Sequence, residues 1–598
     1  MNTSTLQKPQ YALPIAIGGS VLILKLHIFR HLRKYMLPAG LAALVYRSIY
    51  DTNSESLLIL IANILNNATC HRGSKIAGDM LGAVLCIGII RLLSDSLSLN
   101  ISSAKKAFMQ YGYNLVKFLP AVRDKLKEEK LKLESDMEKS MKVKSRKIGG
   151  KQYTSLPAQG MPGDDIIALM EGITKEENVM WQEGRVSGAV YHGGRAHQEL
   201  LNKAFNLYSL ANPLHPDIWP SGMKFESELL SMTASLMTSQ PVQQSGVCGS
   251  TTSGGTESII LAAKAHRDYF REKHGITKPE IVACVSAHAA IEKACSMLCI
   301  KLVQVPMDPV TFKCDVRAME WAIGPNTIML YSSAPQFPQG VIDPISDISK
   351  LAVRYGVGLH VDCCLGGFIL PFARRLGYDI PDFDFDLPGV TSMSVDTHKY
   401  GFTLKGTSIV LYRNKELRHS QYFCFADWTG GMYTTPTIAG SRSTGLIAQA
   451  WASLVTLGEE GFMRNARDII ETARNIGKGV KNIPELEVIG NVEAMIVCFR
   501  SASSDINIYS VGDKMTKRGW SLNSLQSPAA IHLCCTLQHV GREEVFLGDL
   551  RECVEACKTI GGGSAAEGNA AIYGMAATLP PGPLDEMLKV YNDVVYKV

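Results

Sequence analysis

Two lysines lie in one polar loop between two apolar runs of this chain. The loop follows Thr391–Val395, begins with Asp396 and carries His398-Lys399, with Lys405 further along. A lysine amine withdrawn from water has a lowered pKa and can attack a carbonyl carbon. A lone loop lysine is more often solvated. We therefore expect a desolvated, nucleophilic lysine here only if other parts of the chain supply matching groups.

A Gly-rich stretch supplies the first of these groups. Ser253–Ser258 (SGGTES) precedes an apolar-periodic segment, Ile259–Tyr269, that we expect to be helical. Glycines let the backbone approach an anion, hydroxyls donate to it, and a helix N-terminus adds free N–H groups. The stretch therefore predicts a phosphate site, although Ser-Gly-Gly is also an ordinary helix start.

Polar residues follow two expected strands. Asp362 ends the run Val357–Asp362, and His288 follows Ile281–Ser286. A buried strand-end carboxylate needs a cation, and a protonated pyridine nitrogen is one such partner. The alternatives are a structural ion pair for Asp362 and a core histidine for His288. Taken in chain order, an anion loop, a flat imidazole, a carboxylate and an amine are the four groups that pyridoxal 5'-phosphate needs, and they predict that cofactor.

Alternating strand and helix patterns must position these groups. Strand-like runs continue at Lys301–Val305, Thr327–Tyr331 and Thr407–Tyr412. Asp343 and Pro344 are typical of the cap and first-turn proline of a helix, here Ile345–Arg354. Such alternation predicts an α/β fold with a mostly parallel central sheet, whose ligands bind beyond the carboxyl ends of the strands. After about residue 440, helices and further strands predict a smaller α+β C-terminal domain.

The first hundred residues differ from the rest. The segment Ala77–Leu93 is the best candidate for an N-terminal membrane helix, although a buried helix is the alternative. The basic stretch after it predicts that the following side is cytosolic.

The 15 cysteines include no CxxC pair, so we expect reduced thiols and no metal site. We divide the chain into a membrane-anchoring region (1–104), a basic amphipathic linker (105–151), the first segment of the catalytic body (152–244), a large cofactor-binding domain (245–440) and a small C-terminal domain (441–598).

From Lys105 to the C-terminus the chain resembles the sphingosine-1-phosphate lyase family, within the fold type I pyridoxal-phosphate enzymes related to the group II decarboxylases. The motifs that carry the resemblance are SGAVY (187–191), NPLHPDIWP (212–220), TSGGTES (252–258), SAHAAIEKA (286–294), PQFPQGVIDP (335–344), HVDCCLGGF (360–368), DTHKYGFTLKG (396–406), TPTIAGSR (435–442) and AAIYGMA (570–576).

The resemblance implies a role for each matching residue. Lys399 would bind the cofactor covalently, Asp362 would face its ring nitrogen and His288 would stack on the ring. The cofactor phosphate would be held by Gly255, Thr256 and His398, with Ser441 from the other subunit of a homodimer. The positions that match those near the substrate are Tyr191, Asn212, His215 and Lys405.

The chain departs from the family pattern at a few positions. The family usually has Tyr-Ala-Pro at Phe402-Thr403-Leu404, Ala-Cys at Cys363-Cys364 and proline at Ser443. None of these changes removes a charged or nucleophilic group, so they bear on loop rigidity and rate and leave the reaction class unchanged.

The implied reaction is a retro-aldol cleavage of the C2–C3 bond of a sphingoid base 1-phosphate, giving phosphoethanolamine and a long-chain aldehyde. Its general base could be Tyr191, His215, Lys405 or the cofactor phosphate. Tyr191 and His215 could instead only orient the substrate. The expected location is the endoplasmic reticulum membrane, with the catalytic domain facing the cytosol and no nucleic-acid partner. The alternatives are a pyridoxal-dependent amino-acid decarboxylase and a catalytically silent membrane scaffold.

Overall fold

The computed structural model describes residues 153–177, 179–558 and 581–596, with scattered positions between 127 and 138. The chain divides into two compact units, one of Asn178–Ala577 and the other of Met1–Glu177 with Thr578–Val598. The predicted span 77–93 and most of the basic linker lie outside the described residues. No helix that the structure does describe combines the length and apolar character needed to cross a bilayer.

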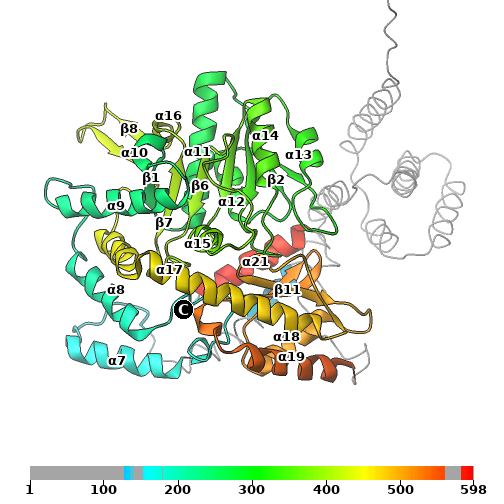
Figure 1. Ribbon diagram of the computed structural model, residues 1–598. Helices are drawn as coiled ribbons and strands as arrows, with labels where there is room; N and C mark the ends of the chain where they lie inside the picture. Colours follow the sequence, from blue (N-terminus) through cyan, green and yellow to red (C-terminus); the bar gives the residue numbers. More distant parts are fainter. Residues whose placement is uncertain are drawn as a thin grey trace, which may run out of the picture. The chain divides into compact units, whose positions relative to one another are not determined.

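A seven-stranded sheet forms the centre of the larger unit, in the order β1-β7-β6-β5-β4-β2-β3 (Figure 1). Strand β7 runs opposite to the other strands of this sheet, which share one direction, so the prediction of a mostly parallel sheet is confirmed. The strands are β1 (Cys248–Thr252), β2 (Glu280–Cys284), β3 (Lys301–Val305), β4 (Thr327–Ser333), β5 (Gly358–Asp362), β6 (Ser392–Val395) and β7 (Ser408–Tyr412).

Helices cover both faces of this sheet. Apolar residues of β2 and β4 such as Ile281 and Met329 pack with α11 (Gly255–His274) and α12 (Ala290–Leu298). The alternate residues, such as Val282 and Leu330, face the opposite way. They belong to the main core, with α13 (Val316–Ala322), α14 (Ile345–Tyr355) and α15 (Leu370–Arg375).

One expected helix start is wrong in detail. The helix α14 begins where the sequence predicts, but its N-cap is Pro344 and no side chain caps it. The carboxylate of Asp343 instead accepts hydrogen bonds from the backbone N–H groups of Ser333 (2.9 Å) and Cys314 (3.1 Å). Two buried donors outcompete the helix end for this carboxylate because unpaired buried N–H groups are costly.

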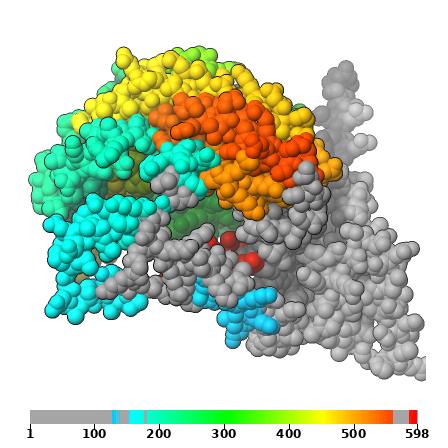
Figure 2. All heavy atoms as spheres, turned by 90° about the horizontal axis from the view of Figure 1, so that it is seen from below, coloured from blue at the N-terminus to red at the C-terminus, as the bar shows by residue number. Residues whose placement is uncertain are grey.

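A second, four-stranded antiparallel sheet has the order β10-β11-β13-β12. Its strands are β10 (Leu486–Val488), β11 (Ile496–Ser501), β12 (Asn523–Gln526) and β13 (Ala529–Cys534). The long helix α17 (Thr444–Lys481), which bends at Gly458, leads into it. Helices α18 (Ile508–Lys517) and α19 (Glu543–Lys558) pack together, and α19 also packs on α17 (Figure 2).

The remaining described elements are α7 (Gly163–Glu176) and α21 (Pro581–Tyr596) in the smaller unit and, in the larger one, α8 (Arg195–Leu207), α9 (Pro220–Leu236), α10 (Val242–Ser245), α16 (Lys415–His419) and the hairpin β8 (Phe423–Phe425) and β9 (Tyr433–Thr435), with two short 3-10 turns.

Strand alternation gives one face of the sheet a polar strip. Leu359 and Val361 of β5 belong to the main core, so His360 and Asp362 point to the opposite face, under α11. Their register partners on β6 are Ser392 and Ser394. The carboxyl end of this strip is where the predicted cofactor site lies.

Candidate active site

Lys399 lies in the turn after β6, and its amine contacts a buried acid. Its Nζ is 2.8 Å from Oδ2 of Asp396, and the lysine side chain is 23% exposed. Burial alone would lower the pKa of Lys399, but the Asp396 carboxylate, followed by smaller charges, raises it well above its usual value. The expectation that Lys399 has a lowered pKa is therefore wrong for the ligand-free chain, because the neighbouring acid outweighs desolvation.

Lys405 behaves as the sequence predicts for a lysine of this loop. Partial desolvation and then the charge of Lys399 lower its pKa, with a smaller opposing effect of Asp396. Its Nζ lies 4.5 Å from the ring centroid of Tyr191, a cation–π contact. The phenol of Tyr191 has a pKa raised by burial and by Cys534, so it carries its proton at neutral pH.

The second sheet positions Tyr191. The backbone of Ser187 and Gly188 bonds to Ser521 and Cys534, respectively, and the Cys534 N–H donates back to Ser187 Oγ. The Tyr191 ring then meets the ring of Tyr400 edge-on, with 4.8 Å between centroids. The candidate site therefore lies between the two sheets.

Asp362 is buried at the end of β5 and is well supplied with donors. Its Oδ2 accepts from the Tyr331 hydroxyl (2.5 Å), and its Oδ1 accepts from the Cys364 N–H (3.1 Å) and Ser394 Oγ (3.2 Å). Burial would raise the pKa of Asp362, but the His288 charge and these hydrogen bonds outweigh it and hold the pKa below its usual value. Asp362 is thus a carboxylate at neutral pH.

The predicted phosphate loop meets these groups at the start of α11. This helix begins at Gly255, earlier than the apolar pattern indicates, so Gly255 and Thr256 lie in its first turn. A Cβ at Gly255 would stand 2.6 Å from Cys364 Sγ and 2.8 Å from Asp396 Oδ1, so only glycine fits. A Cβ at Gly254 would be 3.4 Å from the imidazole of His398. The N–H groups of the first turn of α11 therefore lie beside the loop that carries Lys399.

Two predicted histidines flank this region. His398 accepts a hydrogen bond at Nδ1 from the Thr407 N–H (3.2 Å), and burial lowers its pKa. His288 is exposed and near enough to influence Asp362, and its ring meets Phe337 edge-on at 6.2 Å. Its exposed ring leaves a face available for a flat ligand.

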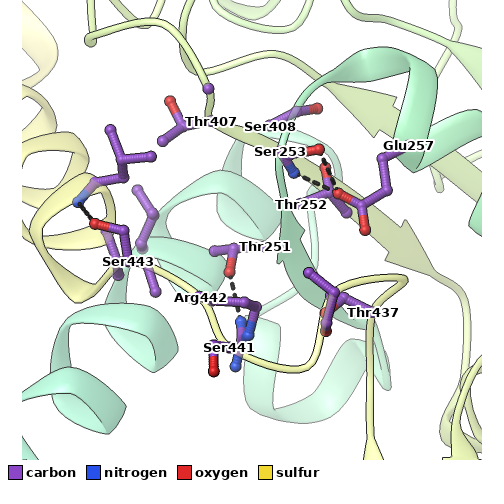
Figure 3. A pocket seen from close by; sticks show the side chains of 15 residues that line it. Thr251, Thr252, Ser253, Glu257, Thr407, Ser408, Thr437, Ser441, Arg442 and Ser443 are labelled. Atoms are coloured by element: carbon purple, nitrogen blue, oxygen red, sulfur yellow. Dashed lines mark hydrogen bonds between the residues drawn. The ribbon is translucent and has the colours of Figure 1, made fainter. Parts of the chain in front are cut away.

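The other predicted substrate residues form a separate group. The Asn212 amide donates to Ser441 Oγ (3.1 Å), and His215 is exposed in the same loop. Among the described residues, no hydrogen bond or ion pair joins this group to Lys399. A cavity of about 200 Å³ adjoins Ser441 and Thr407 (Figure 3). Its lining is rich in hydroxyl groups, from Thr251, Thr252, Ser253, Thr437, Ser441, Ser443, Thr407 and Ser408.

The departures from the family pattern have local partners. The Leu404 N–H, which a proline would lack, donates to Oε1 of the buried Gln449 (2.9 Å). The Thr403 and Thr407 hydroxyls lie 2.7 Å apart, and the Ser443 side chain caps α17. These bonds tie the lysine loop and the start of α17 to neighbouring residues.

The residues present fit pyridoxal phosphate. Asp362 has accepted three protein hydrogen bonds, and a carboxylate can take about four. Asp396 Oδ1 is buried without a hydrogen-bond partner in the part of the chain that the structure describes. An amine, an anion site at a helix N-terminus and an acceptor for a ring N–H thus converge within one site.

Some residues of this site were not assigned from the sequence. Asp396 lies three residues before Lys399 and was placed only in the loop, and Tyr331, Ser394 and Tyr400 received no role. The alternation of polar and apolar residues in β5 and β6 could have indicated Ser394. The contacts of Tyr331 and Tyr400 cross between strands or sheets and leave no local pattern.

Comparisons with known proteins agree with the geometry. Residues 164–502 match the pyridoxal-dependent decarboxylase conserved domain. A sphingosine-1-phosphate lyase of Dictyostelium discoideum is 46% identical over 468 residues, covering 78% of this chain and 86% of that protein. The sphingosine-1-phosphate lyase 1 of Rattus norvegicus is 41% identical, covering 87% and 89%.

Solved structures give the same result. A sphingosine-1-phosphate lyase of Burkholderia pseudomallei aligns with a TM-score of 0.67 and 41% identity, over 69% of this chain and 94% of that chain. A glutamate decarboxylase of Lactobacillus brevis, 19% identical with a TM-score of 0.60 over 68% and 96% of the two chains, shares the fold alone.

The fold and the site define a pyridoxal-phosphate-dependent enzyme of the decarboxylase type. Within that class, the identity and coverage of its relatives show that the chain belongs to the sphingosine-1-phosphate lyase family.

Proposed function

We propose that this chain is a lyase that cleaves the C2–C3 bond of sphingosine 1-phosphate and related sphingoid base 1-phosphates by retro-aldol chemistry. The products are a long-chain aldehyde and phosphoethanolamine, which places the enzyme in sphingolipid catabolism. The observation that carries the proposal is the pair of amines on one loop, Lys399 buried against Asp396 and Lys405 over the ring of Tyr191.

The two amines serve different purposes. Lys399 would hold pyridoxal phosphate, with Gly255, Thr256 and His398 at its phosphate and His288 over its ring. When bound, the cofactor supplies an electron sink for the pair of the breaking C–C bond. Asp396 keeps the Lys399 amine protonated when no cofactor is present.

Lys405 and Tyr191 suit the substrate. Lys405 has no acidic partner among the described residues, so its charge is available for a substrate phosphate. The raised pKa of Tyr191 makes its phenol a hydrogen-bond donor and disfavours it as the base. We assign removal of the C3 hydroxyl proton to His215 or Lys405, and orientation of the substrate to Tyr191 and Asn212.

Product analysis tests this function against its nearest alternative. The purified chain with cofactor is incubated with a long-chain base phosphate, and separately with glutamate and tyrosine. We expect aldehyde and phosphoethanolamine from the lipid and no carbon dioxide from the amino acids. Carbon dioxide release with the lipid left intact would instead identify an amino-acid decarboxylase.

We also propose a homodimer with shared active sites. Support comes from large apolar side chains that are exposed, two of them close to Asn212 in the sequence and two in the loop between β8 and β9: Leu210 (90%), Ile218 (59%), Trp428 (50%) and Met432 (90%). Covering them against a second copy would remove this apolar surface from water. In such a dimer, Ser441 and Asn212 would complete the site of the partner.

Membrane tethering at the endoplasmic reticulum, with the body in the cytosol, is a further proposal. It rests on the apolar segment 77–93 and the basic residues after it. An amphiphilic substrate concentrates in the bilayer, so a tethered enzyme would meet it more often. Deleting residues 1–100 should preserve turnover of a detergent-dispersed substrate and weaken membrane retention. Retention of the truncated chain after a high-salt wash would contradict the tether.

The division at about residue 440 into a cofactor-binding and a C-terminal domain likewise stays a prediction.

A further inference from the structure

The hydroxyl of Tyr331 contacts the acid that would face the cofactor ring. Tyr331 is fully buried on β4, and its Oη donates to Asp362 Oδ2 at 2.5 Å. The register of the sheet explains the contact, since Tyr331 pairs with His360 and Ser333 pairs with Asp362 across β4 and β5. The Tyr331 and His360 rings lie 5.5 Å apart. Nothing in the function proposed above uses this phenol.

The other oxygen of Asp362 belongs to a directed chain of hydrogen bonds. Ser394 Oγ donates to Asp362 Oδ1, and His360 Nε2 lies 3.2 Å from the same Ser394 oxygen. Because the single Ser394 proton is used, His360 must donate through Nε2 and accept from Ser392 at Nδ1 (2.8 Å). Burial lowers the pKa of His360 to about 3, so the imidazole is neutral and this arrangement is stable at ordinary pH.

Tyr331 is therefore the only side-chain donor to Oδ2 among the described residues. Burial and Asp362 raise the pKa of Tyr331 well above its usual range, so its phenol donates its proton and carries no charge. A donor to a carboxylate favours the ionised form and makes that carboxylate a weaker base. It also fixes the rotation of the carboxylate, leaving one defined position for a further donor.

We propose that Tyr331 is a positioning residue that sets the basicity and orientation of Asp362 toward the ring nitrogen of the bound cofactor. The inference rests on the proposed function, because it requires pyridoxal phosphate in this site. The residue that would set the basicity of Asp362 then lies on the neighbouring strand, β4, outside the motifs that identify the family.

Other ionisable groups also face Asp362, from each neighbouring element. They are His288 after β2, His360 on β5, Cys363 and Cys364 after β5, and Lys399 after β6. The thiols have pKa values raised by burial and stay neutral, whereas the electrostatic effects of His288 and Lys399 lower the pKa of Asp362. A Tyr331→Phe substitution leaves all of these groups in place and removes a single hydrogen bond.

The test measures the cofactor dissociation constant as a function of pH for purified wild type and Tyr331→Phe. A protonated Asp362 cannot accept a ring N–H, so affinity falls on the acid side at a pH set by Asp362. Loss of one hydrogen bond to a charged group should move this acid limb upward by about one pH unit. The position of the limb is independent of turnover, and a merely structural role would not move it.

Tyr412→Phe is the matched control. Tyr412 is also fully buried in the same sheet, on β7, and its hydroxyl has no hydrogen-bond partner among the described residues. It should leave the acid limb in place. An unchanged limb in Tyr331→Phe overturns the inference, as does an affinity loss equal at every pH with a lower melting temperature. Failure of the wild type to bind the cofactor would instead refute the proposed function.

Discussion

Lys399 and Asp396 form a buried ion pair, with Nζ and Oδ2 separated by 2.8 Å, within a single turn of chain. The acid lies three residues before the amine, on the side of the loop pressed against Gly255. The pair explains why a partly buried lysine keeps its charge when no cofactor is bound. The reactivity of the Lys399 amine therefore depends on Asp396, a residue of the same turn.

Removing the Asp396 carboxylate should therefore make the Lys399 amine easier to deprotonate. In Asp396→Asn, the pKa of Lys399 should fall, because burial then acts without its largest opposing charge. Only the neutral amine attacks an aldehyde, so the pH at which cofactor uptake reaches half its maximal rate should fall. Stopped-flow absorbance after adding pyridoxal phosphate to ligand-free protein measures this. Asp268→Asn, which breaks the Lys264–Asp268 pair on α11, is the control, and an equal shift in both variants would contradict the account.

The charge on Lys405 should govern substrate affinity. We expect Lys405→Gln to lower kcat/KM for a long-chain base phosphate by about 10–100-fold, the usual size of one hydrogen bond to a charged group. Lys405→Arg keeps the cation and should retain most activity if the residue binds phosphate. If Lys405 is instead the base, Arg should fail as badly as Gln. Lys415→Gln, an exposed lysine on α16, controls for loss of surface charge.

The bond between Leu404 and Gln449 should show coupling. Leu404→Pro removes the N–H and leaves the buried Gln449 oxygen without this donor, at a cost of about 1–2 kcal/mol in the free energy of unfolding. Adding Gln449→Leu to that variant should recover part of the loss, because both partners are then absent. A double-mutant cycle by chemical denaturation measures the coupling. Strictly additive effects would show that this bond does not hold the loop.

Asp343 predicts a pH dependence of stability. Burial raises its pKa to about 6. Between pH 3.8 and about 6, the folded chain therefore keeps a proton on Asp343 that the unfolded chain has lost. The stabilising effect is complete below the unfolded pKa of 3.8 and is lost as the pH rises through about 6. Asp343→Asn should abolish this contribution, of order 2–3 kcal/mol. Unfolding titrations from pH 4 to 7 give the difference from wild type, with the exposed Asp347→Asn on α14 as control.

Mixing inactive subunits tests the shared site. Lys399→Ala and Asn212→Leu chains should each be inactive alone. After co-refolding, random pairing should restore about a quarter of wild-type activity, since half of the dimers carry one intact site. No recovery in heterodimers verified by differential tags would mean that each chain builds its own site.

The elements of this fold were largely predictable because their signals are local. Each of β2–β7 follows from an apolar run, and α14 from the turn at Asp343-Pro344. The cofactor groups were predictable because chain order places them at the ends of parallel strands. Interactions between distant segments were less accessible. The raised pKa of Lys399 depends on a geometry that the turn alone does not specify, and Tyr331 acts through a neighbouring strand. The grouping of Asn212 with Ser441 likewise joins segments far apart in the chain.

The most direct test of the account is to locate the cofactor on the chain. Wild type and Lys405→Arg are loaded with pyridoxal phosphate, reduced with borohydride, digested and mapped by mass spectrometry. We predict that the reduced label lies on the peptide containing Lys399 in both proteins and is absent from Lys399→Ala. A label on Lys405, or the absence of any label from wild type, would contradict it.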